Sequence, residues 1–421
     1  MKRLLVIAYY FPPMGLSGVQ RISKFVKYLP ENGWQPTVLT VEPGGYFAFD
    51  QSLMAELDQA DVSIVRTASW DPTKLFKQKS TVSLPVESSR RWLSGLSQFV
   101  FIPDNKIGWY KPAVEKATTL HNQEPFDAIL ATAPPYTCCL IARKLSRRFN
   151  IPYVLDFRDD WLGNPRHVYP TRLHKKLHKQ LEKRALASSS AVVTINKVIA
   201  TSMKRRHPEL KQEIRVIEQG FDPEDFTSQQ HSRPEKLRFL YTGVFYDVQK
   251  PDFFLKALSS FLINHPSARN ELEADFIGLI PGHTKSLIND LNLQDVVTHQ
   301  PYQPHSVIVE ELQKADVLWL TIGSGPGQES ISTGKLFEYM GTMKPILGLV
   351  PDGTAKQTLN DYAPSFIAAP EQISDIREQI RLIYEAWKEG RLPRAKEENV
   401  SRYDRKNLTT QLARQLNAVL T

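Results

Sequence analysis

The feature that most constrains the fold is a repeated alternation of short apolar runs and longer amphipathic stretches. The apolar runs have the length of strands, and the stretches between them have the length of helices. This alternation is typical of helices packed on a parallel sheet. In the first part of the chain the expected strands are Leu4–Tyr10, Pro36–Leu39, Ala128–Ala131, Tyr153–Asp156 and Ala191–Ile195, and the expected helices include Val19–Tyr28 and Cys138–Phe149.

The alternation stops once and then starts again. The polar stretch from about Thr227 to Lys236 has no periodic apolar pattern, which indicates a linker. The expected strands and helices after it are Leu237–Tyr241, Phe253–Leu262, Ala274–Gly278, Thr284–Leu291, Val296–His299, Val317–Ile322 and Ile346–Val350. A globular chain of 421 residues with 41% hydrophobic and 23% charged residues has room for two or three domains. We therefore expect two Rossmann-like α/β domains, residues 1–230 and 231–400, followed by a segment 401–421.

The last segment has leucines at every fourth position. They are Leu408, Leu412, Leu416 and Leu420. An apolar seam with this spacing predicts a terminal helix that packs on a core.

The cysteine content and the N-terminal residues indicate in which cellular compartment the protein is expected. The only two cysteines, Cys138 and Cys139, are adjacent, which excludes a disulfide framework and favours a reducing compartment. Phe11-Pro12-Pro13 follows the apolar N-terminus in place of a small-residue cleavage site, so a strand is favoured over a signal peptide. No stretch approaches the ~18 apolar residues of a membrane span. We expect a cytoplasmic protein, with attachment to a membrane surface left open.

A glycine-containing turn lies between the first expected strand and helix. It contains the small residues Gly15, Ser17 and Gly18, which let a ligand approach the backbone, and the helix start offers N–H groups to an anion. The turn does not match G-x-G-x-x-G, so it gives little support to a dinucleotide site. A tight turn without a ligand remains an equal alternative.

A second glycine-rich loop follows the strand that ends near Ile322. It contains Gly323, Gly325 and Gly327. Ser332 or Thr333 can then cap a helix. We expect this helix to end near Gly341, because glycine suits a helix C-terminus and Pro345 follows.

This helix carries the strongest candidate site. Gly334 and Glu338 are four residues apart and share a face, so a flat or diphosphate-bearing ligand has room above the helix start. Lys335 and the first-turn N–H groups favour negative charge, and Glu338 can accept hydrogen bonds from a pair of sugar hydroxyls. Leu336 stands where a P-loop requires Ser or Thr, which excludes a Walker A motif. A solvated surface glutamate is the alternative for Glu338.

With these motifs in place, the sequence resembles the retaining family-4 glycosyltransferases of the GT-B type over nearly its whole length. The matching segments are Tyr9–Pro13, the Gly15–Gly18 turn, Tyr153–Trp161, Val216–Asp222, Tyr241–Gly243 and Gly334–Leu347. The resemblance implies two Rossmann-like parallel-sheet domains facing a central cleft, with the C-terminal helix packed back on the N-terminal domain. It also implies sugar transfer from a nucleotide-sugar with retained configuration, with no cofactor and no essential metal. The donor is expected on 231–400 and the acceptor on 1–230.

The resemblance assigns roles to single residues. Glu338 matches the second glutamate of the family's E-x-x-x-x-x-x-x-E motif and is expected to hold the ribose. Ser330 stands in place of the first glutamate, a departure that bears on the donor-sugar contact. Lys250 matches the lysine of a basic pair, but Val244 and Phe245 occupy the stretch where its arginine is expected.

The donor diphosphate is therefore expected to be neutralised by Lys250, Lys335 and helix N–H groups. Tyr302 lies in a turn that often approaches the base in the family. The other expected donor-binding residues are Gly15, Ser17, Gly18, Gly243, Ser332, Thr333, Gly334 and Leu336.

Acidic residues follow one strand of the N-terminal domain. The run Asp-x-x-Asp-Asp from Asp156 offers the oxygen ligands that Mg²⁺ prefers. Arg158 lies between the carboxylates and the family needs no metal, so we favour a salt-bridged, acceptor-binding loop and expect no metal site. Asp156, Arg158 and Asp159 are accordingly the candidate catalytic residues.

The basic excess, 53 Lys plus Arg against 45 Asp plus Glu, gives +8 and indicates an anionic partner. A segment at 172–184 places Leu173, Leu177 and Leu181 on one helical seam and basic residues around it, which suits an anionic membrane surface. A solvated helix packed by its leucines is equally compatible. Arg90–Pro103 is a second candidate for contact with lipid or with a lipid-linked acceptor, but buried packing is the favoured interpretation of its aromatic-apolar run. No zinc-finger spacing or RNA-recognition motif is present, so we expect no nucleic-acid partner.

The sequence thus predicts a cytoplasmic retaining glycosyltransferase, with peripheral attachment at the inner face of the membrane left open. It is expected to transfer a sugar to a glycan or lipid-linked acceptor in cell-surface polysaccharide or glycolipid biosynthesis. The alternatives are a nucleotide-sugar epimerase or hydrolase on the same fold, and a basic, non-catalytic nucleic-acid- or membrane-binding protein.

Overall fold

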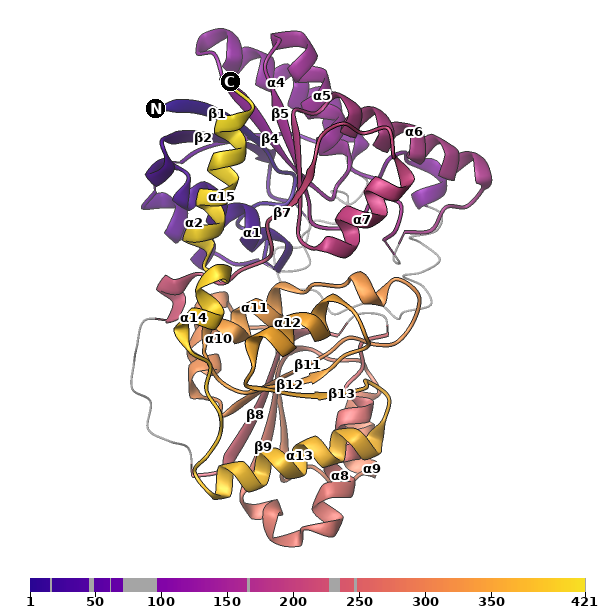
Figure 1. Ribbon diagram of the computed structural model, residues 1–421, viewed down its shortest axis with the longest axis vertical. Coiled ribbons are helices and arrows are strands. Elements are labelled where there is room, and N and C mark those ends of the chain that lie inside the picture. The colour runs from indigo at the N-terminus through magenta and orange to yellow at the C-terminus, as the bar shows by residue number, and fades with distance from the viewer. Residues whose placement is uncertain are drawn as a thin grey trace. The chain divides into compact units, whose positions relative to one another are not determined.

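The computed structural model describes residues 1–15, 17–44, 49–60, 62–70, 97–164, 167–226, 235–245 and 248–420. The chain forms two compact units (Figure 1). Unit 1 comprises Met1–Gln219 and Arg405–Thr421, and unit 2 comprises Gly220–Asp404. Most of the expected linker, half of Arg90–Pro103 and the side chain of Ser17 lie outside the described residues.

Unit 1 is built on a seven-stranded parallel sheet. Its strands are β1 (Lys2–Ile7), β2 (Trp34–Val41), β3 (Ser63–Thr67), β4 (Ala128–Ala133), β5 (Tyr153–Phe157), β6 (Ala191–Thr194) and β7 (Ile214–Val216). The order β3-β2-β1-β4-β5-β6-β7 is that of a doubly wound Rossmann-like sheet. The central strands are continuous apolar runs because both of their faces are buried under helices.

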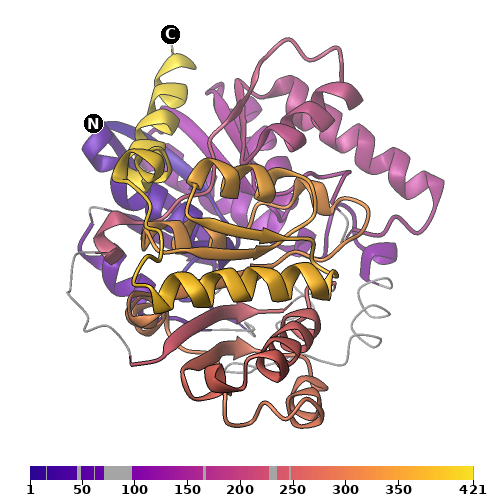
Figure 2. The same cartoon turned by 60° about the horizontal axis from the view of Figure 1, so that its bottom comes forward.

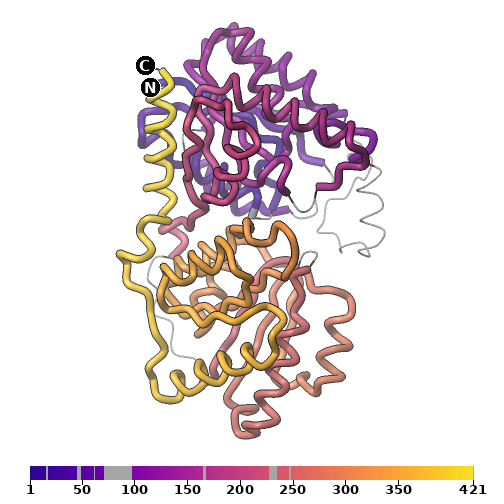
Figure 3. Tube along the Cα trace, turned by 45° about the vertical axis from the view of Figure 1, so that its right-hand side comes forward, coloured from indigo at the N-terminus to yellow at the C-terminus, as the bar shows by residue number. Residues whose placement is uncertain are grey.

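Helices cover both faces of this sheet. They are α1 (Ser17–Tyr28), α2 (Ser52–Asp58), α4 (Tyr110–Gln123), α5 (Thr137–Phe149), α6 (Arg172–Ser188), α7 (Lys197–Arg206) and α15 (Arg405–Ala418), with 3₁₀ turns η1 (Pro30–Asn32) and η3 (Ile107–Trp109). One core cluster joins the sheet to α4, α5 and α7, and another joins it to α1 and α15. The leucines of the terminal segment, Leu408, Leu412 and Leu416, are buried in the second cluster beside β1, and Figure 3 shows both chain ends within unit 1.

Unit 2 repeats the architecture with six parallel strands. They are β8 (Leu237–Val244), β9 (Leu272–Leu279), β10 (Val297–Gln300), β11 (Val317–Thr321), β12 (Ile346–Leu349) and β13 (Ser365–Ala368). The order β10-β9-β8-β11-β12-β13 reverses direction between β8 and β11. The predicted pair of Rossmann-like parallel-sheet domains is confirmed.

The helices of unit 2 also form two layers. They are α8 (Asp252–Asn264), α9 (Thr284–Asp290), α10 (His305–Lys314), α11 (Gly334–Gly341), α12 (Thr354–Tyr362), α13 (Ile373–Lys388) and α14 (Glu397–Val400), with 3₁₀ turns η4 (Pro223–Phe226), η5 (Pro266–Asn270), η6 (Gln328–Ser330) and η7 (Ser401–Tyr403). Helices α8 and α13 pack on one face, where Figure 2 shows α13 as the long golden helix. Helices α10, α11 and α12 pack on the other face.

Helix α6 does not pack through Leu173 and Leu177, the first two leucines of its predicted seam. Leu173 and Leu177 are 63% and 38% exposed. The buried positions are His178, Glu182, Ala185 and Leu186. The alternative of a helix packed by its leucines is therefore wrong for the first two turns of α6. Arg206 of α7 and the next residue, His207, pair with Glu182 and allow the polar face to be buried. Among the described residues, no helix has both the length and the apolarity to cross a bilayer.

Candidate functional site

The candidate site of unit 2 lies where the strand order reverses, between β8 and β11. In parallel α/β sheets, ligands bind outside the carboxyl ends of the strands at such a reversal. Gly243 is the second-last residue of β8, and the glycine-rich loop from Gly323 follows β11 at this edge. Helix α11 follows that loop, so its N-terminus belongs to the same edge of the sheet.

The start of α11 is not capped by a side chain. Thr333 is the N-cap residue in an extended conformation, but its hydroxyl makes no cap hydrogen bond. The Ser332 hydroxyl is buried and has no hydrogen-bond partner among the described residues. Thr333 therefore occupies the predicted N-cap position, but the predicted side-chain cap is wrong for both residues. The Leu336 N–H donates to the Thr333 carbonyl at 3.1 Å, and the N–H groups of Gly334 and Lys335 point to an external acceptor.

The end of α11 agrees with the sequence. The helix stops at Gly341, as predicted. A Cβ at Gly341 would lie 2.6 Å from the Phe226 ring and 2.8 Å from the Phe221 ring. Only glycine fits at this point.

Lys335 lies across Gly243 and against an aromatic ring. Its Nζ is 3.7 Å from the centroid of the Tyr241 ring. Gly243 has φ +108°, and a Cβ there would be 3.2 Å from Lys335 Cε, so glycine leaves the space that the lysine fills. Burial lowers the pKa of Lys335 to about 7, against the opposing effect of Glu338. The amine can therefore gain or lose its charge near neutral pH.

Glu338 lies one turn further along α11 and is only slightly exposed, at 12% of its side chain. Its Oε1 is 3.3 Å from Nε2 of His305, the first residue of α10. His305 was not predicted, because it lies 33 positions before Glu338 and only the fold brings the two together.

Tyr339 joins α11 to β8. Its hydroxyl accepts a hydrogen bond from the Thr242 backbone N–H at 2.9 Å. Burial raises the pKa of this hydroxyl, so it stays protonated and can also donate to Thr242 Oγ1, 3.2 Å away. This pair fixes the helix start beside Gly243 and was also not predicted.

The remaining predicted donor residues of unit 2 lie on loops. Ser330 donates from its hydroxyl to the Gly327 carbonyl at 2.8 Å, within the glycine-rich loop. Lys250 is exposed just before α8, and Tyr302 is partly buried between β10 and α10. The expected donor-binding role of Leu336 must be corrected, because its side chain is wholly buried in the core under α11 and offers no surface to a donor.

In unit 1 the glycine turn is tied to Arg158. The Arg158 guanidinium donates through Nη1 to the Gly18 carbonyl and through Nη2 to the Pro134 carbonyl. A Cβ at Gly18 would lie 3.0 Å from Nη1, and Gly15 is buried before the helix start. Burial lowers the pKa of Arg158. Its guanidinium thus joins the segments that follow β1 and β4.

Asp156 must be reassigned. It is 0% exposed and accepts hydrogen bonds from Arg21 Nε at 3.1 and 3.2 Å and from Arg21 Nη2 at 2.8 Å. Arg21 also donates to the Ile217 and Glu218 carbonyls at 2.9 and 2.6 Å. A carboxylate enclosed in this way has no surface for an acceptor, so its role is to hold α1 against β5.

The Asp-x-x-Asp-Asp carboxylates do not converge on one point. Asp160 pairs with Arg206, whose Nη1 donates to Oδ2 at 2.8 Å, while Asp156 pairs with Arg21. The salt-bridged loop expected around Arg158 is therefore held by two other arginines. Of the three carboxylates, only Asp159 is partly exposed at this edge of unit 1.

Comparisons with known proteins cover nearly the whole chain. The profile of the "Glycosyl transferase 4-like domain" family matches residues 18–220, and that of "Glycosyl transferases group 1" matches residues 223–406. No curated protein sequence matches the chain.

Solved structures share the fold. Anabaena HepE in complex with UDP and glucose has a TM-score of 0.65 at 16% identity, covering 99% of this chain and 100% of its own. Sucrose-phosphate synthase from Thermosynechococcus elongatus has a TM-score of 0.67 at 14% identity, with the same coverage of 99% and 100%. The lipopolysaccharide outer core galactosyltransferase WaaB has a TM-score of 0.55 at 13% identity, covering 99% of both chains.

Proposed function

Because this chain belongs to the group 1 glycosyltransferases, a retaining and metal-independent family of the GT-B fold, we propose that unit 2 binds a nucleotide-sugar through α11. The chain transfers a sugar from such a donor. The observation that carries the assignment of the site is the coincidence, at one sheet edge, of an uncapped helix start, Lys335 and Glu338. The N–H groups and the amine suit a diphosphate, and the carboxylate suits the ribose hydroxyls.

A UDP-sugar is the first donor to test. HepE, which shares the fold, has been crystallised with UDP and with UDP-glucose. Ser330 replaces the glutamate expected near the donor sugar and turns its hydroxyl to Gly327, so the sugar contact is expected to come from loop backbone groups instead. The preferred donor sugar must therefore be identified by screening nucleotide-sugars.

Unit 1 is proposed to hold the acceptor. Gly15, Gly18, Arg158 and Asp159 lie at the carboxyl edge of its sheet, and Asp159 is the partly exposed carboxylate able to receive a hydroxyl proton or position the hydroxyl. Arg158 acts through Gly18 rather than on the acceptor itself.

The acceptor is proposed to be a glycan or a lipid-linked molecule in cell-surface polysaccharide or glycolipid biosynthesis. Exposed Leu173 and Leu177 on the basic helix α6 support a membrane surface as the place of reaction. The two free, buried cysteines support a cytoplasmic location, at the inner face of the membrane.

Binding to unit 2 is tested with Glu338→Gln. We expect nucleotide-sugar binding to weaken while the far-UV spectrum and thermal midpoint stay unchanged. Glu310→Gln, at an exposed glutamate of α10, is the matched control. Unchanged donor affinity in calorimetry would refute the assignment of Glu338.

The reaction is tested by a thermal-shift screen of common nucleotide-sugars, followed by product identification. A glycosylated acceptor with retained configuration is expected. A free sugar, or an epimer still attached to the nucleotide, would instead establish a hydrolase or an epimerase.

A further inference from the structure

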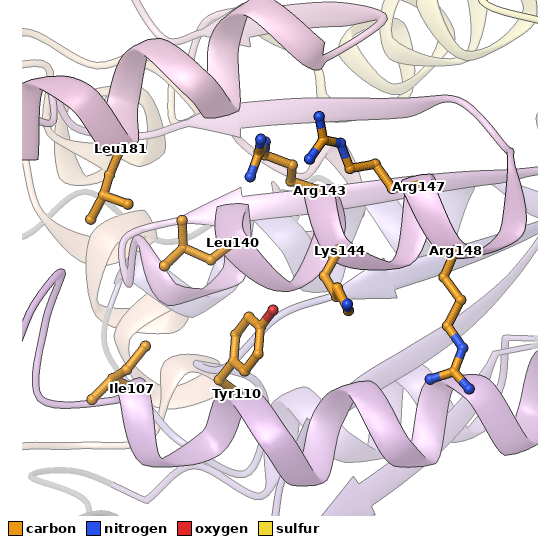
Figure 4. Close-up of a pocket in the computed structure, with 8 residues that line it drawn as sticks. All are labelled: Ile107, Tyr110, Leu140, Arg143, Lys144, Arg147, Arg148 and Leu181. Atoms are coloured by element: carbon orange, nitrogen blue, oxygen red, sulfur yellow. The ribbon is translucent and has the colours of Figure 1, made fainter.

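A ligand-sized hollow lies on the helical surface of unit 1. It has a volume of about 580 Å³, within the ~300–1,000 Å³ of typical ligand pockets. It extends over α5 between α4 and α6, as the close-up shows (Figure 4). The residues that line it are Ile107, Tyr110, Leu140, Arg143, Lys144, Arg147, Arg148 and Leu181.

The hollow is distinct from the edge of unit 1 proposed to hold the acceptor. Helix α5 begins directly after β4, at the carboxyl edge of the sheet, and runs back toward the amino edge before β5. At ~1.5 Å per residue, Arg147 lies about 15 Å along the helix from its start. The basic part of the hollow therefore lies away from the edge where Rossmann-like sheets bind substrates.

The lining divides into an apolar end and a cationic end. Figure 4 shows Leu181, Leu140, Ile107 and Tyr110 toward one side and the lysine and arginines toward the other. A ligand that matches both ends is amphiphilic, with an anionic group attached to an apolar chain. A free inorganic anion would leave the apolar end unused.

The cations have no anionic partner within the part of the chain that the structure describes. No ion pair or side-chain hydrogen bond involves Arg143, Lys144, Arg147 or Arg148. The Nε atom of Arg143 is buried and lacks any hydrogen-bond partner there. Acids on the flanking helices are engaged elsewhere, since Glu115 lies 3.9 Å from Lys111 and Glu182 binds Arg206 and His207.

Helix electrostatics alone do not account for this cluster. Arg147 and Arg148 lie in the last turn of α5, where cations are favourable. Arg143 and Lys144 lie a turn earlier, and each faces another cation four residues on, an unfavourable arrangement without an anion. An anion bound among the four would satisfy the buried Nε and remove the repulsion.

Exposed apolar residues of α6 and its surroundings extend the apolar surface beyond the apolar end of the hollow. Leu177 and Leu173 lie four and eight residues before Leu181 on α6, and both are exposed. The Phe99 ring, also exposed, lies 5.1 Å from the His174 ring of the same helix. These side chains form a surface on which acyl chains can lie next to the hollow.

We propose that this hollow binds the phosphate headgroup of an anionic phospholipid, with the start of its acyl chains against Leu140 and Leu181. The headgroup phosphate accepts hydrogen bonds from Arg143 and Arg147, and the exposed leucines of α6 contact the surrounding membrane. The inference goes beyond the proposed function, because it concerns a lipid that is neither donor nor acceptor.

The test uses the full chain and short-chain phosphatidylglycerol, held below the concentration at which it forms micelles. Arg143→Gln/Arg147→Gln should bind it at least tenfold more weakly by calorimetry. Lys175→Gln/Lys179→Gln removes equal charge from exposed positions of α6 outside the hollow and should change the affinity less than threefold. Equal losses in both variants would overturn the proposal in favour of a diffuse electrostatic effect.

Two further arms identify the ligand. Leu140→Ser should weaken phosphatidylglycerol binding but not the binding of glycerol 3-phosphate, and glycerol 3-phosphate should bind far more weakly than the lipid. Equal affinity for the two would overturn the lipid assignment and indicate a soluble phosphate. Sedimentation with phosphatidylglycerol vesicles should exceed that with phosphatidylcholine vesicles, and Arg147→Gln/Arg148→Gln should abolish the difference.

Failure here is distinguishable from failure of the proposed function. All these variants should keep a cooperative unfolding transition and the wild-type affinity for a nucleotide-sugar, and only Leu140→Ser should lower the thermal midpoint, because Leu140 packs on the core of unit 1. A variant that loses lipid and keeps donor binding supports the lipid site alone. Loss of donor binding together with lipid binding would mean that the substitution disturbs the fold, and would overturn the assignment of a separate site.

Discussion

Lys335 makes nucleotide-sugar binding sensitive to pH in a way that can be calculated. Its amine packs on the Tyr241 ring beside the uncapped start of α11, and burial lowers its pKa to about 7. A diphosphate binds the charged amine more strongly than the neutral one. The affinity for a nucleotide-sugar should therefore be constant well below pH 7 and fall as the pH rises through 7.

The size of the effect follows from the charged fraction. With a pKa of about 7, roughly nine-tenths of the amines are charged at pH 6 and roughly one-tenth at pH 8. If the charged form alone binds tightly, the affinity falls about tenfold over this interval, or ~1.4 kcal/mol. The bound diphosphate raises the pKa of Lys335 in the complex. The affinity stops falling once the pH exceeds that raised pKa.

Calorimetry with UDP-glucose at pH 6, 7, 8 and 9 measures this fall. The diphosphate of a nucleotide-sugar is esterified at both ends and does not titrate in this range, so the protein alone supplies the dependence. Lys335→Met keeps the length of the side chain and removes its charge. The variant should bind more weakly than the wild type at pH 6 and show no fall between pH 6 and 8. A flat wild-type profile, or the same fall in Lys335→Met, would refute the reasoning.

The same substitution should stabilise unit 2 at neutral pH. The pKa of Lys335 is lower in the folded state than its ordinary value of 10.5, so between pH 7 and 10.5 the unfolded chain binds more protons. The lysine therefore costs stability at pH 7, and the cost disappears as the pH approaches 10.5. Because the residue is partly exposed, we expect a gain of only ~1–2 kcal/mol in Lys335→Met by urea unfolding. Lys356→Met, at an exposed helical lysine, should change neither stability nor donor binding.

Two further substitutions test the structure of each unit. Arg21→Met should destabilise unit 1 by ~3–5 kcal/mol in chemical unfolding, because it leaves the Asp156 carboxylate buried and unpaired. The double variant Arg21→Met/Asp156→Leu should recover most of that loss. A double variant as unstable as the single one would contradict this explanation. Gly243→Ala should cost ~1 kcal/mol through its positive φ and weaken donor binding by displacing Lys335. Gly282→Ala, where a Cβ meets nothing within 4 Å, is the control, and equal donor affinity in both variants would disprove the packing argument.

The periodicity of the sequence located the central strands and helices within a few residues. β5 extends to Phe157 where the sequence indicated Asp156, and α5 starts at Thr137 where it indicated Cys138. Central strands are buried on both faces, so they appear as apolar runs that need no knowledge of their neighbours. The end of α11 at Gly341 was also predicted, although the structure requires glycine there because of the Phe221 and Phe226 rings, which are distant in sequence.

Three outer strands, β3, β7 and β13, were not predicted, whereas the outer strand β10 was expected at Val296–His299. β3 and β13 are edge strands with largely half-exposed residues, and β7 has only three residues. At an edge, one side of the strand lacks a partner and alternate residues face solvent. The apolar signal is then too weak to separate such strands from loops.

The roles of charged residues depended on contacts distant in sequence. Asp156 was expected to face a substrate, yet its partner Arg21 lies 135 positions away and encloses it. Likewise the buried face of α6 includes Glu182, which is neutralised by Arg206 from α7. A charge pattern along one helix does not reveal partners on another, so the sequence could identify charged residues but not which of them are enclosed.

The discontinuous build of unit 1 bears on how the chain is made. Its first segment ends at Gln219, and its last helix, α15, follows only after all of unit 2. The apolar surface of β1 and α1 that receives Leu408, Leu412 and Leu416 is thus synthesised early and covered last. Chains emerge from the ribosome N-terminus first, and domains generally fold as they emerge. Here the first unit to emerge is the last to complete its core, and every nascent chain carries an uncovered apolar face until α15 has been synthesised.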